Sequence, residues 1–301
     1  MSASTAAKKL VVCGGSGFLG SRICKAAVRR GWDVTSISRS GEPQWKTVTS
    51  SPTPPPWAHK VFWERADIFR PAEYVALLKG ADYVVHTMGI LLEADYKDVI
   101  SGRESPIAGL KRAFSPAARS ANPLERRGPN STTPEFKPPT SGRQLTYEMM
   151  NRDSAILLAK EAAREHVAAF GYISAAAGAP VLPGRYITTK REAEHVIVAE
   201  FPEMRGVFFR PPFMYDSSRP FTLPIAAAAT ALDTVIGPFK GKLGGLDTLL
   251  GAAALRPLKV DLVAEAVVEG LADEHVKGVV EDVRDFNELE SRSLAKAPNF
   301  S

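Results

Sequence analysis

Short apolar runs alternate with amphipathic stretches along the first two thirds of this 301-residue chain. Compact apolar runs bounded by glycine or charged residues are typical of buried strands, and apolar residues at every third or fourth position are typical of helices. The expected strands cover residues 10–13, 33–38, 60–64, 83–87, 168–174 and 206–210. The expected helices cover residues 22–30, 72–79, 146–165 and 185–201. This alternation predicts a parallel sheet with helices on both faces.

The first expected strand runs into a glycine-rich turn, and the turn runs into the first helix. Gly14, Gly17 and Gly20 are spaced as G-x-x-G-x-x-G. In such a unit the first glycine permits the turn, the second lets backbone N–H groups approach a pyrophosphate, and the third packs the helix on the strand. We therefore expect an α/β fold with a Rossmann-type doubly wound sheet. Phe18 and Leu19 join the three glycines in the predicted dinucleotide site.

The pattern loosens after residue 210, and this change predicts a domain boundary. We expect an NAD(P)-binding domain over 1–210 and a small substrate or partner lobe over 211–301, whose final helix packs back on the core. The lobe contains an apolar, glycine-interrupted stretch at 220–245 and a helix at 261–272. Within the first domain, residues 101–145 hold seven prolines and six serines but few large apolar side chains. Such a segment buries too little apolar surface to order itself, so we expect a mobile insertion.

The excess positive charge lies in that insertion. The chain has 38 Lys and Arg against 33 Asp and Glu, and residues 101–145 contain eight of the cations and three of the acids. The rest of the chain is neutral, which argues against nucleic acid as a partner. The insertion is either a solvated linker or a surface for phosphate or lipid, so peripheral membrane contact stays open. We expect no transmembrane segment, and neither the two cysteines nor the five histidines have the spacing of a metal site.

The second strand ends in a sequence that bears on cofactor choice. An NAD-specific unit has an acidic residue there, whereas this chain has Ser38-Arg39-Ser40. A guanidinium flanked by hydroxyls suits a 2′-phosphate, so NADP(H) is favoured over NAD(H), although a solvated arginine at a strand end is the simpler alternative. Asp67 follows the third strand and either touches the adenine edge or caps the next helix. Thr87 and Gly89, after the fourth strand, are expected to line the cofactor.

The reactive end of the site is predicted from one helix and the strand before it. Tyr186 and Lys190 are four residues apart and therefore share a helix face. An ammonium near a phenol favours the phenolate, and a positioned tyrosine can exchange a proton with an alcohol or a carbonyl. Ser174, at the end of the preceding strand, can hydrogen-bond the same substrate oxygen.

These motifs, in this order, resemble the extended short-chain dehydrogenase/reductases over nearly the whole chain. The resemblance implies that Tyr186 and Lys190 form the acid/base pair and that Ser174 polarises the substrate. Asn151 matches a helix asparagine that supports a proton relay. Arg210 begins R-P-x-x-x-Y, the sequence that leads toward the substrate lobe, and we count it among the cofactor-binding residues. Asp216 stands where that motif usually has a glycine.

Within this family, the glycine turn and the stretch 185–194 are most similar to an atypical mitochondrial subgroup. Its members include accessory proteins of ubiquinone (coenzyme Q) biosynthesis and of respiratory complex I. The resemblance implies a place on the matrix side of the inner membrane, a multiprotein assembly as partner, with the ubiquinone-biosynthesis complex favoured, and a quinone-like ligand. An ordinary soluble reductase or epimerase is a further alternative. Members of the subgroup often bind cofactor without turnover, so Tyr186 and Lys190 either catalyse a reaction or only bind the nicotinamide ribose.

Overall fold

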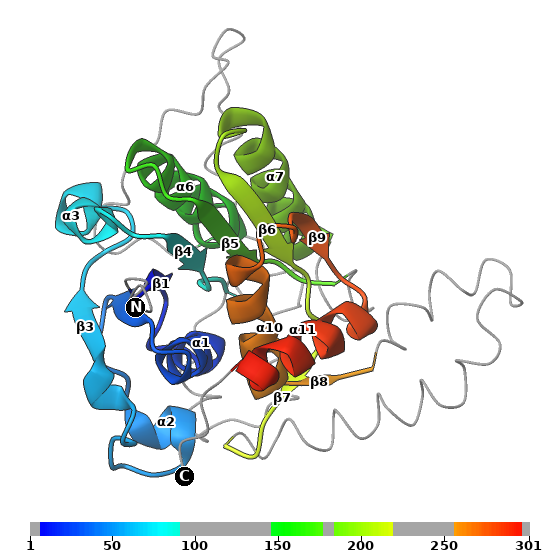
Figure 1. Cartoon of the computed structure of the whole chain (residues 1–301). Helices are drawn as coiled ribbons and strands as arrows, with labels where there is room; N and C mark the ends of the chain where they lie inside the picture. The colour runs from blue at the N-terminus through cyan, green and yellow to red at the C-terminus, as the bar shows by residue number, and fades with distance from the viewer. Residues whose placement is uncertain (1–6, 91–145, 177–183, 219–255, 297–301) are drawn as a thin grey trace, which may run out of the picture.

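A computed structural model describes residues 7–90, 146–176, 184–218 and 256–296. The insertion expected at 101–145 and the apolar stretch at 220–245 lie outside these residues. A seven-stranded parallel sheet with the order β3-β2-β1-β4-β5-β6-β9 runs through the molecule (Figure 1). Its strands are β1 (Lys9–Cys13), β2 (Asp33–Ser38), β3 (Val61–Arg65), β4 (Tyr83–His86), β5 (Ala169–Ile173), β6 (Arg205–Phe209) and β9 (Gly278–Val280). The predicted doubly wound α/β class is confirmed.

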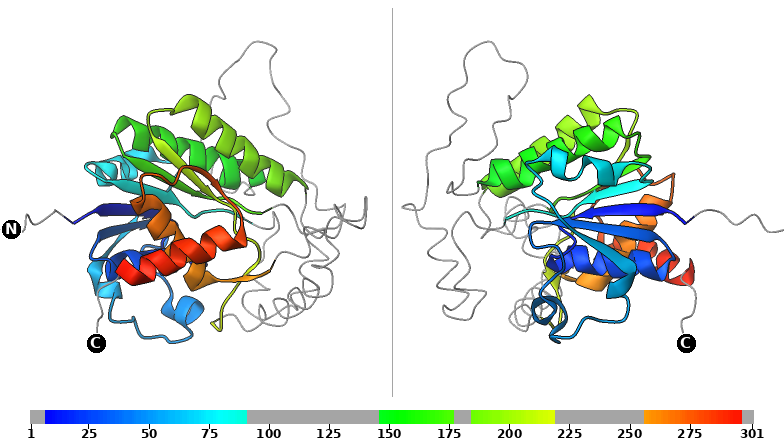
Figure 2. Two further views of the ribbon diagram at one scale, coloured as in Figure 1. Left: turned by 45° about the vertical axis from the view of Figure 1, so that its right-hand side comes forward. Right: turned by 90° about the vertical axis from the view of Figure 1, so that its left-hand side faces the viewer.

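Helices cover both faces of this sheet (Figure 2). One layer holds α1 (Phe18–Arg29), α10 (Val260–Ala272) and α11 (Val283–Lys296), and the other holds α3 (Val75–Leu78), α6 (Ser154–Arg164) and α7 (Gly184–Glu200). The remaining elements are α2 (Trp45–Thr49), the 3-10 turns η1 (Ala58–Lys60) and η2 (Pro71–Glu73), and a π-helical turn η5 (Glu148–Asp153) that runs into α6. A separate two-stranded ribbon joins β7 (Met214–Tyr215) to β8 (Leu258–Lys259).

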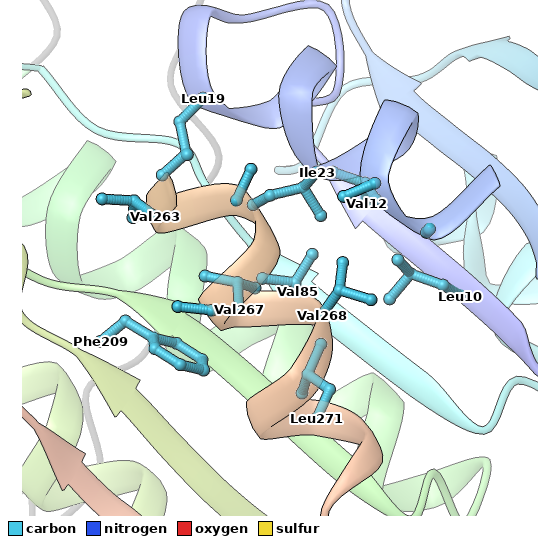
Figure 3. Close-up of a cluster of buried hydrophobic side chains, with 14 of the residues drawn as sticks. Leu10, Val12, Leu19, Ile23, Val85, Phe209, Val263, Val267, Val268 and Leu271 are labelled. Atoms are coloured by element: carbon cyan, nitrogen blue, oxygen red, sulfur yellow. The ribbon is translucent and has the colours of Figure 1, made fainter. Parts of the chain in front are cut away.

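The larger part of the core forms where α10 packs beside α1 and against the sheet. Val263, Val267 and Val268 of α10 are fully buried against strand residues and against Ile23 of α1 (Figure 3). Each such side chain contributes about 1.5–3 kcal/mol relative to its exposure in the unfolded chain. Helix α10 is buried on nearly all sides because α1, α11 and the sheet surround it. Helix α1, near the start of the chain, is therefore packed against α10, near its end.

Ion pairs continue the contact between these helices. Glu269 of α10 is completely buried, and its carboxylate accepts bonds from Arg30 at 2.5 Å and Lys296 at 2.6 Å, with Arg292 at 3.3 Å. On β6, the guanidinium of Arg205 donates to four carbonyl oxygens in and after the last turn of α10. A basic side chain satisfies the free carbonyls at a helix end in this way.

The carboxyl-terminal residues that the structure describes belong to the same layers. Strand β9 pairs with β6 at the edge of the large sheet, and α11 packs on α10. Neither strand β9 nor helix α2 was expected from the hydrophobic pattern. Strand β9 has three residues, of which Val279 is exposed, so it lacks the buried apolar run that identifies a strand in sequence.

Candidate cofactor and active site

The glycine turn between β1 and α1 is tightly packed against the segment after β4 and against the helix itself. Gly14 has φ +89°, and a Cβ there would lie 2.6 Å from Thr87 Oγ1. A Cβ at Gly20 would lie 2.2 Å from the carbonyl oxygen of Gly14, so the helix lies directly on the turn. Gly17 is exposed, and within the described chain no side chain caps the first turn of α1. The turn therefore presents backbone at a helix N-terminus, an arrangement suited to a pyrophosphate.

The adenosine end of the site would lie at the end of β2. Arg39 is exposed beyond β2, and Ser40 Oγ donates to Ser16 Oγ in the glycine turn at 3.1 Å. This bond holds the residue after Arg39 against the turn. Asp67 Oδ1 accepts the N–H of Phe69 at 3.0 Å. This bond closes a turn in the loop after β3 but does not cap the next helical turn, η2, which begins after Arg70 and has no side-chain cap. The second carboxylate oxygen of Asp67 accepts no bond that the described residues show.

The segment after β4 joins the two ends of the predicted site. Thr87 Oγ1 donates to the carbonyl oxygen of Cys13 at 2.9 Å, which binds this segment to the strand before the glycine turn. Two residues on, a Cβ at Gly89 would lie 3.0 Å from Asn151 Oδ1 and 3.4 Å from Lys190 Nζ. Residues 87–89 therefore run from the glycine turn to the predicted acid/base residues.

Tyr186 and Lys190 lie together on α7, as their spacing predicts. Lys190 is buried, its Nζ donates to the carbonyl oxygen of Ile173 at 2.8 Å, and it lies 5.5 Å from the ring centroid of Tyr186. The same Nζ lies 5.1 Å from the ring centroid of Tyr172. The rings of Tyr147 and Tyr186 meet edge to face, with 5.9 Å between centroids. Two further tyrosine rings thus flank the pair: Tyr172 lies beside the lysine, and Tyr147 lies against the candidate proton donor Tyr186.

The protonation of this pair differs from the expectation of a favoured phenolate. Burial raises the pKa of Tyr186 to about 12, and Tyr147 adds to the rise. Burial lowers the pKa of Lys190 to about 7, against the opposing charge of Glu194. The desolvation that penalises the phenolate also penalises the ammonium, and it is the largest effect on each group. At neutral pH the phenol is protonated and can donate its proton.

Asn151 lies in the π-helical turn η5, whose extra residue re-aims the helix at this point. Its side-chain Oδ1 accepts the N–H of Ile90 at 3.0 Å, and its backbone carbonyl oxygen accepts a bond from the Tyr172 hydroxyl. Beside it, Arg185 at the start of α7 forms a two-pronged ion pair with Glu148, its Nη2 lying 2.7 and 2.8 Å from the two carboxylate oxygens. This ion pair fixes α7 to the turn that carries Asn151.

Ser174 and Arg210 belong to a second cluster at the carboxyl ends of β5 and β6. Ser174 Oγ accepts a bond from Arg191 Nη1 at 2.8 Å. Arg191 Nη1 also bonds Glu194 at 2.8 Å, and Glu194 in turn accepts from Arg210 at 2.5 Å. A further carboxylate, Glu281, lies 2.8 Å from Arg210 Nη1. Arg210 thus braces α7 and the residue after β9, whereas the sequence motif assigns it to cofactor binding.

Sequence reasoning missed several residues that shape this site. Tyr147 and Tyr172 flank the Tyr186–Lys190 pair, and Arg191 holds Ser174. Sequence position could have indicated Arg191, because it directly follows Lys190 on the helix that comes after the strand ending at Ser174. Nothing in the spacing identifies Tyr147, since it precedes a π-helical turn that sequence periodicity does not predict. Among the described residues, no helix is long and apolar enough to cross a bilayer, and no three His, Cys, Asp or Glu side chains gather as metal ligands.

Comparison with known proteins adds to this geometry. Residues 10–97 match the NAD dependent epimerase/dehydratase family. The chain is 35% identical over 285 residues to the MIOREX complex component 2 of Saccharomyces cerevisiae, covering 90% of this chain and 96% of that protein. It is 25% identical over 281 residues to an uncharacterised chloroplast protein of Arabidopsis thaliana, covering 92% of this chain and 76% of that one.

Solved structures share the fold at low identity. The Bordetella bronchiseptica enzyme WbmF, solved with NAD+, matches with a TM-score of 0.52 at 15% identity, over 98% of this chain and 80% of its own. Vestitone reductase from alfalfa matches with a TM-score of 0.51 at 18% identity, over 91% of this chain and 76% of its own. The chain thus belongs to the class of proteins with this dinucleotide-binding fold, and residues 10–97 match the epimerase/dehydratase family, as the glycine turn predicts. Within that class it belongs to the same family as the yeast MIOREX complex component 2.

Proposed function

We propose that this chain binds NADP(H) along the carboxyl edge of its sheet. The pyrophosphate would lie on the glycine turn, and the nicotinamide would lie toward Tyr186 and Lys190. The observation that carries the proposal is the segment 87–89, which packs against Gly14 at one end and beside Lys190 at the other. The glycines fit such a cofactor because side chains at Gly14 or Gly20 would collide with their neighbours, while Gly17 is open to an approaching phosphate.

The preference for NADP(H) over NAD(H) rests on the end of β2. Arg39 is exposed there, Ser38 and Ser40 flank it, and no acidic residue takes the place of a ribose ligand. A guanidinium can form two bonds to a 2′-phosphate. Titration calorimetry should therefore give a lower Kd for NADPH than for NADH, and Arg39→Ala should reduce the difference about tenfold or more. Arg70→Ala is the matched control, since Arg70 is exposed and pairs with Glu73 alone among the described residues. Equal affinities for the two coenzymes in the unaltered protein would contradict the NADP(H) preference.

We further propose that the site supports reduction of a carbonyl group or the reverse oxidation of an alcohol. The bound dinucleotide supplies or accepts the hydride. In the reducing direction, the Tyr186 phenol donates its proton to the substrate oxygen, and the Ser174 hydroxyl donates a hydrogen bond to the same atom. A guanidinium can only donate hydrogen bonds. Arg191 therefore donates to the Ser174 oxygen and leaves the serine proton free to bond the substrate. Tyr186→Phe should abolish turnover and leave the NADPH Kd within a few-fold. A large loss of affinity, with no turnover in the unaltered protein, would favour a role in binding alone.

In the cell, we propose a mitochondrial protein on the matrix side of the inner membrane that acts in a multiprotein assembly. Membership in the family of a yeast complex component supports the assembly, and the resemblance to the atypical mitochondrial subgroup supports the compartment. A redox step on a quinone intermediate of ubiquinone biosynthesis, or a cofactor-dependent assembly role there, is the favoured task. We assign cofactor binding to residues 1–210 and contact with substrate or partner to residues 211–301.

Metabolite profiling of a deletion strain tests this assignment. A loss of ubiquinone with accumulation of an intermediate is expected, and unchanged levels would refute the pathway. Co-purification with respiratory complex I, with normal ubiquinone in the deletion strain, would instead indicate an accessory subunit of that complex. Turnover of small alcohols or nucleotide sugars by the purified protein with NADPH would indicate an ordinary soluble reductase or epimerase.

A further inference from the structure

A buried ion pair joins the first helix to the segment that follows β7. Arg22 of α1 approaches Asp216 with 3.0 Å between Nη2 and Oδ1, and the two side chains are 9% and 15% exposed. The same carboxylate oxygen accepts the N–H of Ser218 at 2.8 Å, and Arg22 Nη2 also donates to Ser218 Oγ at 3.2 Å. Burial works against ionisation of Asp216, but its bonds from Ser218 and the charge of Arg22 outweigh it and lower the pKa below the ordinary value. Asp216 is therefore ionised at neutral pH, and its charge faces the guanidinium.

The guanidinium of this pair lies beside the turn to which the proposed function assigns the pyrophosphate. Arg22 Cζ is 5.5 Å from the ring centroid of Phe18, the first residue of α1. Its Nη1 donates to Ser21 Oγ at 3.3 Å, and Ser21 Oγ donates to the carbonyl oxygen of Phe18 at 3.3 Å. The positive end of the helix dipole faces the same place. A negative charge at Asp216, where the related motif has a glycine, would weaken this anion site if no cation accompanied it.

The two charges of the pair have opposite effects on a bound anion. Arg22 attracts a pyrophosphate at the helix N-terminus, and Asp216 repels it. Because both groups are largely buried, salt screens them less than it screens surface charges. At separations of several ångströms and the effective dielectric of a protein, one unit charge changes the affinity for an anion by about tenfold.

We propose that Arg22 and Asp216 are positioning residues that set the strength of the pyrophosphate site. Arg22 supplies the cation that strengthens the first turn of α1, and Asp216 is the counter-ion that holds the guanidinium in place and limits its attraction. This inference rests on the proposed binding of a nicotinamide dinucleotide. It adds two residues that lie 194 positions apart in the chain to a site otherwise assigned to the glycine turn.

The proposal predicts opposite signs for two single substitutions, measured as NADPH Kd by titration calorimetry. Arg22→Met keeps a chain over Phe18 but leaves the carboxylate alone, and it should weaken binding about tenfold. Asp216→Asn keeps an oxygen for the N–H of Ser218 but frees the positive charge, and it should tighten binding several-fold. The double variant should return to near the affinity of the unaltered protein. Arg22→Lys retains the charge and should stay within a few-fold of it.

A second pair on the same helix gives the control. Lys25→Met breaks the Lys25–Asp261 pair, whose side chains are 42% and 49% exposed, and it should leave the Kd unchanged. If Arg22→Met and Asp216→Asn weaken binding equally, the pair is a structural brace and the proposal is wrong. If neither substitution alters the Kd in folded protein, the charges do not reach the cofactor, and the proposal fails as well. Failure of the unaltered protein to bind NADPH or NADH would instead refute the proposed function and withdraw this inference with it.

Discussion

Replacing Gly14 by alanine separates the two reasons for a glycine at this position. The residue has φ +89°, which costs an L-residue about 1–2 kcal/mol. A Cβ would also lie 2.6 Å from Thr87 Oγ1 and 3.0 Å from Met88 Cγ, so the segment after β4 must move. That movement breaks the bond from Thr87 to the carbonyl of Cys13, a further loss of about 1 kcal/mol. We expect Gly14→Ala to lower the free energy of unfolding by about 2–3 kcal/mol in total.

The structure offers a matched control at the end of α1. Gly31 has φ +73°, and nothing lies within 4 Å of a Cβ placed there, so Gly31→Ala carries the backbone cost alone. Urea unfolding, followed by tryptophan fluorescence, measures both variants with one linear extrapolation. The cluster of Trp45, Trp57 and Trp63 beside β3, with ring centroids 5.5–6.4 Å apart, provides the signal. Gly14→Ala should also weaken NADPH binding at least about tenfold, because the displaced segment borders the site. Equal losses of stability in the two variants would refute the tight packing on which the glycine-turn argument depends.

Four further predictions follow from the buried polar groups. Glu269→Gln should lower the free energy of unfolding by about 3 kcal/mol, because it leaves Arg30 buried beside a neutral group. Glu288→Gln, at an exposed position, should change the free energy of unfolding little in the same urea assay. Arg205→Met should lower the melting temperature far more than Arg284→Met, since the first frees four carbonyl oxygens and the second alters a side chain that is 92% exposed. The pKa of Lys190 is about 7, below its ordinary value, so the unfolded chain binds more protons than the folded protein from about pH 7 to 10. The stability of the protein relative to Lys190→Met should therefore rise with pH across that range. A pH-independent difference would contradict the lowered pKa. Ultraviolet titration of the protein against Tyr186→Phe should show no phenolate from Tyr186 below about pH 11, and a phenolate signal near pH 9 would contradict the raised pKa.

The sheet and the glycine turn could be predicted from sequence because each depends on local signals. Strands such as β1 are buried on both faces and therefore appear as continuous apolar runs, and Gly14, Gly17 and Gly20 have fixed spacing within one strand-turn-helix unit. The helix spacing of Tyr186 and Lys190 also places them correctly on one face. These features need no knowledge of the distant chain.

Features that depend on distant contacts could not be predicted in this way. The protonation of Tyr186 is set by burial among rings from other elements, so a rule for an isolated lysine–phenol pair gives the wrong direction. Arg210 and Ser174 are held by charged partners on α7 and after β9, which a motif does not reveal. Asp216, unusual at its position in the motif, finds its partner Arg22 almost two hundred residues earlier in the chain.

The position of α10 bears on how the protein is made. The inner face of α1 stays uncovered by its main packing partner until residues 260–272 have left the ribosome, so a nascent chain would carry exposed valine and isoleucine side chains through most of its synthesis. Contacts of such long sequence separation slow folding. Because a late helix completes the packing of the first βα unit, we expect the nascent chain to need chaperones, and a chain truncated before α10 should fail to fold in a proteolysis assay.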